Sequence, residues 1–196
     1  MNVAIVKYNA GNLFSVVNAL RRLGVEPVIT DSMEELQRAD HVVFPGQGHA
    51  GTTMNYLRAH HLDRMIRDLR QPVLGICVGM QLLCRHSEEG DTDCIGVFPE
   101  AVKRFVPRSH ADKVPAMGWN ALYNCTSPLF KGISEEDFVY FIHSYYVSLG
   151  AHTIAKTDYT LPYSAALHKD NFWAVQFHPE KSGRVGFRLL ENFLSF

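Results

Sequence analysis

The first 85 residues alternate short apolar runs with amphipathic segments, and this alternation restricts the fold more than any other feature of the sequence. The run NVAIVKY at 2–8 is typical of a strand buried on both faces of a parallel sheet. NLFSVVNALRRLG at 12–24 carries apolar residues at helical spacing, and Gly24 is placed to end that helix. Such alternation requires right-handed crossovers and gives a mainly parallel sheet. Further strands are predicted at 25–30, 41–46 and 72–76, and a helical stretch at 49–69.

The second half shows closely spaced strand candidates separated by turn residues, which indicates an antiparallel or mixed extension. These candidates are 137–148, 152–157, 163–169 and 171–178. A final helix is predicted to begin at Ser182, a residue suited to the N-cap. Its apolar face holds Phe187, Leu190, Phe193 and Leu194. We therefore expect an α/β fold with an open, mainly parallel twisted sheet, helices on both faces, and this extension.

Composition excludes several classes of function. With 196 residues, of which 46% are hydrophobic, the chain is expected to form a single domain, 1–196, with a full core. Nineteen basic and twenty acidic side chains give a formal charge of −1, so we predict no nucleic-acid partner and no binding to anionic membranes. No apolar run approaches the roughly 18 residues of a membrane span. Four cysteines without a C-x-x-C pair, and no leader-like start, favour a reduced, cytoplasmic chain.

Ten histidines raise the question of a zinc site. The sequence contains no H-E-x-x-H motif and no cysteine and histidine cluster with ligand spacing. The adjacent His60 and His61 would point in different directions on a helix. We therefore predict no metal and no cofactor.

The stretch GICVG at 75–79 places a cysteine between a strand and a helix. Glycine inside a strand or helix costs about 0.5–1 kcal/mol relative to alanine, so the two glycines indicate a turn too tight for side chains. Such a turn resembles a nucleophile elbow and would lift the Cys77 sulfur toward the helix N-terminus. Unpaired N–H groups there favour a thiolate, and that of Val78 could hold an oxyanion. On this stretch alone, a buried structural cysteine remains the alternative.

A thiolate that performs acyl transfer needs a proton donor for its leaving group. AVQFHPE at 174–180 ends a strand candidate with His178, and Glu180 follows two residues later. In an extended chain the two side chains would project to the same side, and Pro179 would stiffen that arrangement. The carboxylate could then orient the imidazole, as in a catalytic triad. Taken alone, a histidine before proline is more often structural.

The loop PGQG at 45–48 follows a predicted strand and precedes a helix. The glycines Gly46 and Gly48, on either side of Gln47, would let backbone N–H groups face a ligand closely. A plain turn is the alternative for this loop by itself. The loop, Cys77 and His178 all follow predicted strands, however, and an open α/β sheet gathers its active site at the carboxyl ends of its strands.

These motifs resemble those of the class I glutamine amidotransferases. The segments PGQG, GICVGMQLL and HPE occur in that order, and YNAGNLFSV (8–16), MGWN (117–120), YFIHSYYV (140–147) and FHPEKSG (177–183) are similar to glutaminase subunits of imidazole glycerol phosphate synthase. The resemblance covers essentially the whole chain. It implies hydrolysis of glutamine to glutamate and ammonia, with the ammonia used in histidine biosynthesis.

The resemblance also implies roles for individual residues. Cys77 would be the nucleophile, His178 the general acid and base, and Glu180 its orienting carboxylate. The oxyanion hole would comprise Gly46, Gln47, Gly48 and Val78, and the substrate-binding positions would be Gln81, Glu89, Ser144 and Tyr145. A solvated surface charge remains the alternative for Glu89. Two departures stand out, because the family usually has an apolar residue at Gln47 and other residues at Lys7 and Asn9.

The implied partner is a separate cyclase subunit, a (β/α)₈ barrel that forms a heterodimer with the glutaminase and receives its ammonia. The positions that match its interface are Asn12, Met117, Trp119 and Lys181. A core aromatic is the alternative for Trp119.

Other functions remain open at the level of sequence. The glutaminase of pyridoxal phosphate or aminobenzoate synthesis would share Cys77, His178 and Glu180, but YNAGNL and MGWN disfavour it. A cysteine peptidase or DJ-1-like protein would lack the paired PGQG and HPE segments. A non-catalytic binding module is disfavoured by the intact triad residues.

Overall fold

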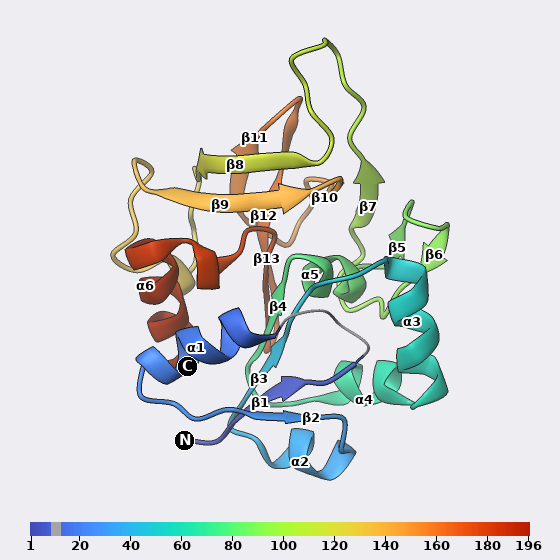
Figure 1. Cartoon of the computed structure of the whole chain (residues 1–196), viewed down its shortest axis with the longest axis vertical. Coiled ribbons are helices and arrows are strands. Elements are labelled where there is room, and N and C mark those ends of the chain that lie inside the picture. The colour runs from blue at the N-terminus through green and yellow to red at the C-terminus, as the bar shows by residue number, and fades with distance from the viewer. Residues whose placement is uncertain (9–12) are drawn as a thin grey trace.

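The computed structural model describes residues 1–8 and 13–196. In this part of the chain an eleven-stranded sheet has the order β2-β1-β3-β4-β13-β12-β10-β7-β5-β6, with β11 paired to β12, and β8 and β9 form a separate two-stranded sheet (Figure 1). The strands are β1 (Val3–Val6), β2 (Val28–Thr30), β3 (His41–Phe44), β4 (Val73–Ile76), β5 (His86–Ser87), β6 (Thr92–Asp93), β7 (Ala101–Arg104), β8 (Ala116–Ala121), β9 (Phe138–His143), β10 (Tyr145–Val147), β11 (Thr153–Asp158), β12 (Pro162–Lys169) and β13 (Phe172–Val175).

Five neighbouring strands, in the order β2-β1-β3-β4-β13, form the parallel core of the sheet. Each neighbouring pair in the order β2-β1-β3-β4-β13 is parallel, whereas β13, β12, β10 and β7 pair antiparallel. The predicted fold class is confirmed. Because β3, β4 and β13 are adjacent and parallel, the residues that follow them meet at one edge of the sheet.

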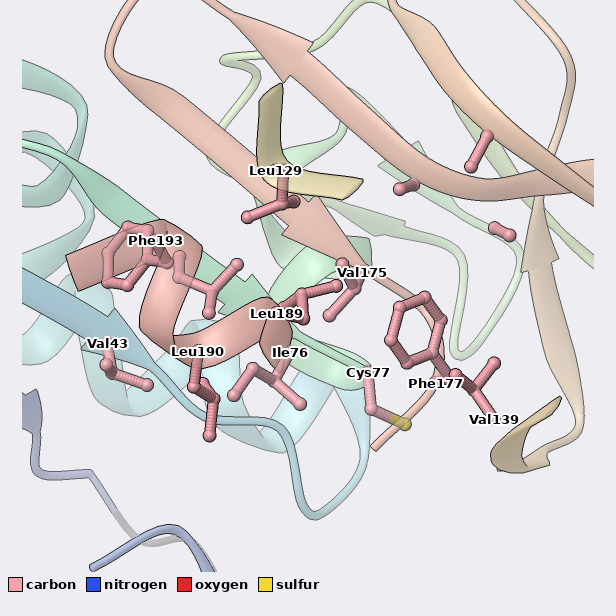
Figure 2. Packing of buried hydrophobic residues seen from close by; sticks show 14 of the residues in the cluster. Val43, Ile76, Cys77, Leu129, Val139, Val175, Phe177, Leu189, Leu190 and Phe193 are labelled. Carbon is pink, nitrogen blue, oxygen red and sulfur yellow. The ribbon is translucent and has the colours of Figure 1, made fainter. Parts of the chain in front are cut away.

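Helices cover both faces of this core (Figure 1). Buried residues of α1 and α6 pack in one hydrophobic cluster, and those of α2, α3, α4 and α5 pack mainly in a second cluster. Figure 2 shows the first cluster, with Leu189, Leu190 and Phe193 of α6 near the core strands and Cys77 just beyond Ile76 of β4. The helices are α1 (Phe14–Arg22), α2 (Met33–Arg38), α3 (Ala50–Ala59), α4 (Leu62–Asp68), α5 (Val78–Leu83) and α6 (Gly183–Leu194), with 3₁₀ turns η1 (Pro128–Phe130) and η2 (Pro179–Lys181).

Three predicted elements differ in detail. The helical stretch 49–69 is two helices, because His61 adopts a left-handed conformation with φ 57° between α3 and α4. The strand candidate 137–148 is divided at Ser144 into β9 and β10, which belong to different sheets. Ser182 does occupy the N-cap position of α6, but its side chain makes no capping bond.

The hydroxyl of Ser182 instead anchors the turn that carries His178. It donates to the carbonyl of His178 at 2.6 Å and accepts the N–H of Tyr140 on β9 at 3.0 Å. The N–H of His178 donates to the carbonyl of Tyr140 at 2.9 Å. The small β8-β9 sheet is thereby tied to the edge where β13 ends. None of the helices in the described part of the chain is long and apolar enough to cross a bilayer.

Candidate active site

Cys77 occupies a strained turn between β4 and α5. Its φ of 53° and ψ of −111° lie outside the regions that a residue with a side chain readily adopts. The N–H of Cys77 donates to the carbonyl of Val175 on β13 at 2.8 Å, and its carbonyl accepts the N–H of Gln81 at 3.2 Å. The neighbouring strand and the first turn of α5 thus hold the predicted elbow in place.

The glycines around Cys77 permit close contact between this turn and the loop 45–48. A Cβ atom on Gly79 would lie 2.1 Å from the carbonyl oxygen of Phe44, and one on Gly46 would lie 2.2 Å from the backbone nitrogen of Val78. Real Cβ atoms do not approach other atoms so closely. The loop after β3 therefore packs directly on the N-terminus of α5, which brings the predicted oxyanion residues together.

His178 lies three residues beyond the end of β13, lines the same pocket as Cys77, and is near enough for the two side chains to interact. Burial lowers the pKa of His178, but hydrogen bonds and charge interactions with Cys77 and Glu180 outweigh this effect and raise the pKa from 6.5 to about 10. The direction follows because negative charge on either neighbour favours the protonated imidazole. The structure thus places side by side the two side chains that the sequence predicts to be nucleophile and proton donor.

Glu180 orients the imidazole from the other side. Its Oε1 accepts from His178 Nδ1 at 2.7 Å, and both side chains are about 95% buried. The expected extended backbone is wrong here, because residues 179–181 form the 3₁₀ turn η2. The contact forms all the same, since the turn folds the carboxylate back onto the ring. A carboxylate at Nδ1 leaves Nε2 as the nitrogen available toward the sulfur.

A pocket of about 370 Å³ opens in front of Cys77. Its lining includes most of the predicted site residues, namely Gly46, Gln47, Gly48, Cys77, Val78, Gln81, Glu89, Ser144, Tyr145, His178 and Lys181, together with Pro115, Ile142 and His143. Glu180 lies behind His178 rather than in the lining. The volume and the mixed polar lining suit a ligand of the size of an amino acid.

The backbone of Gln47 is hydrogen-bonded to Tyr8, a residue for which the sequence analysis predicted no role. Its N–H donates to the hydroxyl of Tyr8 at 3.3 Å, and that hydroxyl donates to the carbonyl of Pro45 at 2.5 Å. Burial raises the pKa of Tyr8 well above its ordinary value, so the phenol stays neutral. Tyr8 thus bridges two points of the loop 45–48 in this structure.

The side chain of Gln81 is almost fully buried at the wall of the pocket. Its Nε2 donates to the carbonyl of Tyr145 at 2.9 Å and to Oε1 of Gln176 at 3.0 Å. Both N–H bonds are thereby used, and Oε1 is left as the group that can accept from a ligand. The carbonyl of Ser144 accepts the N–H of Phe105 at 3.0 Å.

Glu89 lines the pocket and accepts the N–H of Ala50 at 2.7 Å, at the N-terminus of α3. A carboxylate is favourable there because of the helix dipole. The alternative of a solvated surface charge is wrong, since Glu89 is part-buried and hydrogen-bonded.

His143 is a second pocket histidine, and no motif in the sequence singles it out. Nδ1 lies 2.7 Å from the carbonyl of Tyr145, which can only accept, so Nδ1 carries the proton and Nε2 accepts from the Tyr163 hydroxyl at 3.1 Å. Burial above all, together with the nearby charge of His178, lowers the pKa of His143 to about 4. His143 is therefore neutral and structural.

The predicted interface residues are distributed over two places. Met117 and Trp119 lie on β8 with 63% and 57% of their surfaces exposed, so the alternative of a core aromatic at Trp119 is wrong. Lys181 is exposed at the end of η2 and reaches the pocket lining. Asn12, like Asn9, lies outside the described residues. Across 1–8 and 13–196, no three histidine, cysteine, aspartate or glutamate side chains gather as metal ligands would.

Comparisons with known proteins show the family of the chain. The sequence profile of the class-I glutamine amidotransferase family matches residues 4–195. The chain is 64% identical to imidazole glycerol phosphate synthase subunit HisH of Bacteroides thetaiotaomicron and 43% identical to subunit HisH 2 of Legionella pneumophila, with at least 97% of each chain covered in both cases.

The fold is also that of solved amidotransferase-like structures. A putative GMP synthase protein of Thermoplasma acidophilum superposes with a TM-score of 0.75 at 23% identity, over 100% of this chain and 93% of that one. At that identity the likeness concerns the fold alone. The full-length identity to HisH subunits sets aside the pyridoxal phosphate, aminobenzoate and DJ-1-like alternatives. The chain belongs to the class-I glutamine amidotransferases and, within them, to the family of HisH subunits of imidazole glycerol phosphate synthase.

Proposed function

We propose that the chain hydrolyses the side-chain amide of glutamine through a covalent thioester on Cys77. The observation that carries this proposal is that Cys77 and His178 line one pocket of amino-acid size and interact there, with Glu180 hydrogen-bonded to His178. Residues 1–196 act as one amidotransferase domain in this proposal.

In the first half-reaction the Cys77 thiolate attacks the amide carbon of glutamine and forms a carbon–sulfur bond, while the carbonyl electrons move to oxygen. The imidazolium of His178 gives its proton to the amide nitrogen, the carbon–nitrogen bond breaks, and ammonia leaves. The neutral imidazole then takes a proton from water, whose hydroxide adds to the thioester. The carbon–sulfur bond then breaks, which releases the thiolate and a carboxylic acid that loses its proton to water and leaves as glutamate, while Cys77 and His178 regain their starting charges.

The N–H of Val78 and the loop 46–48 hold the tetrahedral oxyanion in this mechanism. Loss of one such donor costs about 2.7–4 kcal/mol in barrier height. The N–H of Gln47 can contribute only after it leaves the Tyr8 hydroxyl, because one N–H does not serve both acceptors well. The loop therefore has to rearrange if Gln47 takes part.

In this proposal the α-amino and α-carboxylate groups of the substrate bind to pocket residues other than the triad and the oxyanion loop. We assign the ammonium to Oε1 of Gln81 and to Glu89, both of which supply acceptors. We assign the carboxylate to backbone N–H groups of Ser144 and Tyr145, whose carbonyl oxygens are already used within the protein.

The chain also works with a partner in this proposal. Free ammonia in neutral water becomes ammonium, which is not nucleophilic, so a productive glutaminase passes it directly to an acceptor. The relatives are named as subunits of imidazole glycerol phosphate synthase. We infer a cytoplasmic heterodimer with a (β/α)₈ cyclase subunit, in which Met117, Trp119 and Lys181 face the partner and ammonia enters histidine biosynthesis.

Measured glutamate production with and without the cyclase and its nucleotide substrate tests this function. We expect weak hydrolysis by the isolated chain and strong stimulation by the loaded cyclase. Trp119→Ala should weaken the stimulation, whereas Met33→Ala, which removes another large exposed apolar side chain, on α2, should not. Absence of stimulation for the unmodified chain would refute the partnership.

A further inference from the structure

Gln176 is a fully buried amide that lies against the reactive sulfur. It follows β13 and precedes His178 by two residues, and none of its surface is exposed. Its backbone N–H donates to the carbonyl of Ala165 on β12 at 2.8 Å, which fixes its position between two strands. Its Nε2 lies 3.7 Å from Cys77 Sγ, a hydrogen-bonding distance for an atom as large as sulfur.

The orientation of this amide follows from its neighbours. The carbonyl of Tyr145 can only accept, so the group of Gln81 that faces it at 2.9 Å is the NH₂ group. The second N–H of that group then requires an acceptor, which is Oε1 of Gln176 at 3.0 Å. Gln176 must therefore present its own NH₂ group to Cys77, and a flipped amide would leave two donors facing each other.

Within residues 1–8 and 13–196, few other side chains can stabilise a negative charge on this sulfur. His178 supplies a positive charge, with Glu180 behind it. The phenols of Tyr8 and Tyr163 are near enough to sense the Cys77 charge, but burial raises the pKa of both and keeps them neutral. The carbonyl of Ile142, 3.9 Å from Sγ, can accept from a thiol but offers nothing to a thiolate. The N–H of Gln176 is thus a neutral donor toward the sulfur.

We propose that Gln176 stabilises and orients the Cys77 thiolate through this N–H···S bond, and that Gln81 positions the Gln176 amide for it. A donor to the ionised form favours that form over the neutral thiol. The bond also makes the thiolate a better leaving group when the thioester is hydrolysed, because negative charge returns to the sulfur at that step. This inference rests on the proposed role of Cys77 as the nucleophile.

The test is the pH profile of Cys77 alkylation by iodoacetamide, followed by mass mapping of the Cys77 peptide. Gln176→Met removes the donor at similar volume. We expect the midpoint of the profile to move upward by about one unit, a roughly tenfold loss of thiolate near neutral pH, with the limiting rate at high pH unchanged. A merely structural defect would alter the limiting rate without moving the midpoint.

A second variant at Gln176 and a remote control variant complete the experiment. Gln176→Glu keeps an acceptor for Gln81 at almost the same volume, but its negative charge disfavours the thiolate. The midpoint of its alkylation profile should therefore also move upward. Gln71→Met removes a remote glutamine amide that donates to the Leu36 carbonyl, and its profile should match that of the unmodified chain. Unchanged midpoints in both Gln176 variants would overturn the proposal. Because alkylation needs no glutamine, this outcome is independent of whether Cys77 hydrolyses glutamine.

Discussion

The hydroxyl of Tyr8 and the backbone N–H of Gln47 form a hydrogen bond of 3.3 Å, and the same hydroxyl donates to the carbonyl of Pro45. The two bonds connect the end of β1 to the loop that follows β3. While these bonds persist, the Gln47 N–H donates to Tyr8 and is not available to an oxyanion. The resting loop is therefore stabilised by a group that takes no part in the proposed chemistry.

Tyr8→Phe should raise glutamine hydrolysis by the isolated chain. Loss of the two bonds destabilises the resting loop by about 1 kcal/mol, which corresponds to about a fivefold gain in the alternative conformation. Measurement of kcat without a partner checks this. Tyr56→Phe removes a remote hydroxyl that bonds to Asp31 and should leave kcat unchanged. A lower kcat in Tyr8→Phe would show that the hydroxyl serves the active loop instead.

Glu180→Gln should lower kcat by about 10³- to 10⁴-fold, because an amide no longer fixes the imidazole or stabilises its cation. The substitution keeps the volume of a side chain that is almost fully buried, so thermal unfolding should show a folded protein. Glu191→Gln, which removes the surface ion pair with Arg188, provides the control. Equal losses in the two variants would contradict the orienting role of Glu180.

Gly46→Ala should abolish activity and reduce the free energy of unfolding. The new Cβ would overlap the carbonyl of Ile76 and the nitrogen of Val78, which are backbone atoms that cannot move aside cheaply. Urea unfolding and glutaminase assays measure both effects. Gly51→Ala in α3 should be neutral or stabilising by up to about 1 kcal/mol, since its Cβ meets only side-chain atoms. An active Gly46→Ala variant would argue against close packing of the loop on α5.

His143 should make the protein sensitive to acid. Its pKa is about 4 in the folded chain and 6.5 as an ordinary histidine, so between these values the unfolded chain binds a proton that the folded chain does not. The free energy of unfolding should therefore fall as pH drops through this window, by about 2 kcal/mol at pH near 5.

Urea unfolding of His143→Asn at pH near 7.5 and near 5 checks this contribution. The variant loses two hydrogen bonds and is less stable overall, but its stability should depend less steeply on pH. In His60→Asn, at the exposed C-terminal end of α3, the free energy of unfolding should depend on pH as in the unmodified chain. A slope in His143→Asn equal to that of the unmodified chain would contradict the assignment.

The parallel core and the triad were predictable because their signals are local. Apolar runs define β1, β3 and β4, and the glycines around Cys77 mark a turn whose strained φ the structure contains. The motif HPE places His178 and Glu180 two residues apart, and they meet even though the backbone between them is a turn rather than an extended segment.

The residues that sequence reasoning missed depend on distant contacts. Nothing in the run FVYFIHSYYV reveals that β9 pairs with β8 while β10 joins β7 and β12, because those partners lie far along the chain. Gln176 follows the apolar strand β13, and Tyr8 follows β1, with Lys7 and Asn9 as its neighbours in the sequence. The roles of their polar groups depend on contacts with Cys77 and Gln47, which the sequence does not reveal.

The most direct test of the nucleophilic role of Cys77 is intact-protein and peptide mass spectrometry after acid quenching of the chain during glutamine turnover. We predict a glutamyl adduct on the peptide that contains Cys77, and neither adduct nor glutamate from a folded Cys77→Ala variant. Glutamate production by Cys77→Ala at the rate of the unmodified chain, with no adduct on Cys77 at any time, would contradict the account.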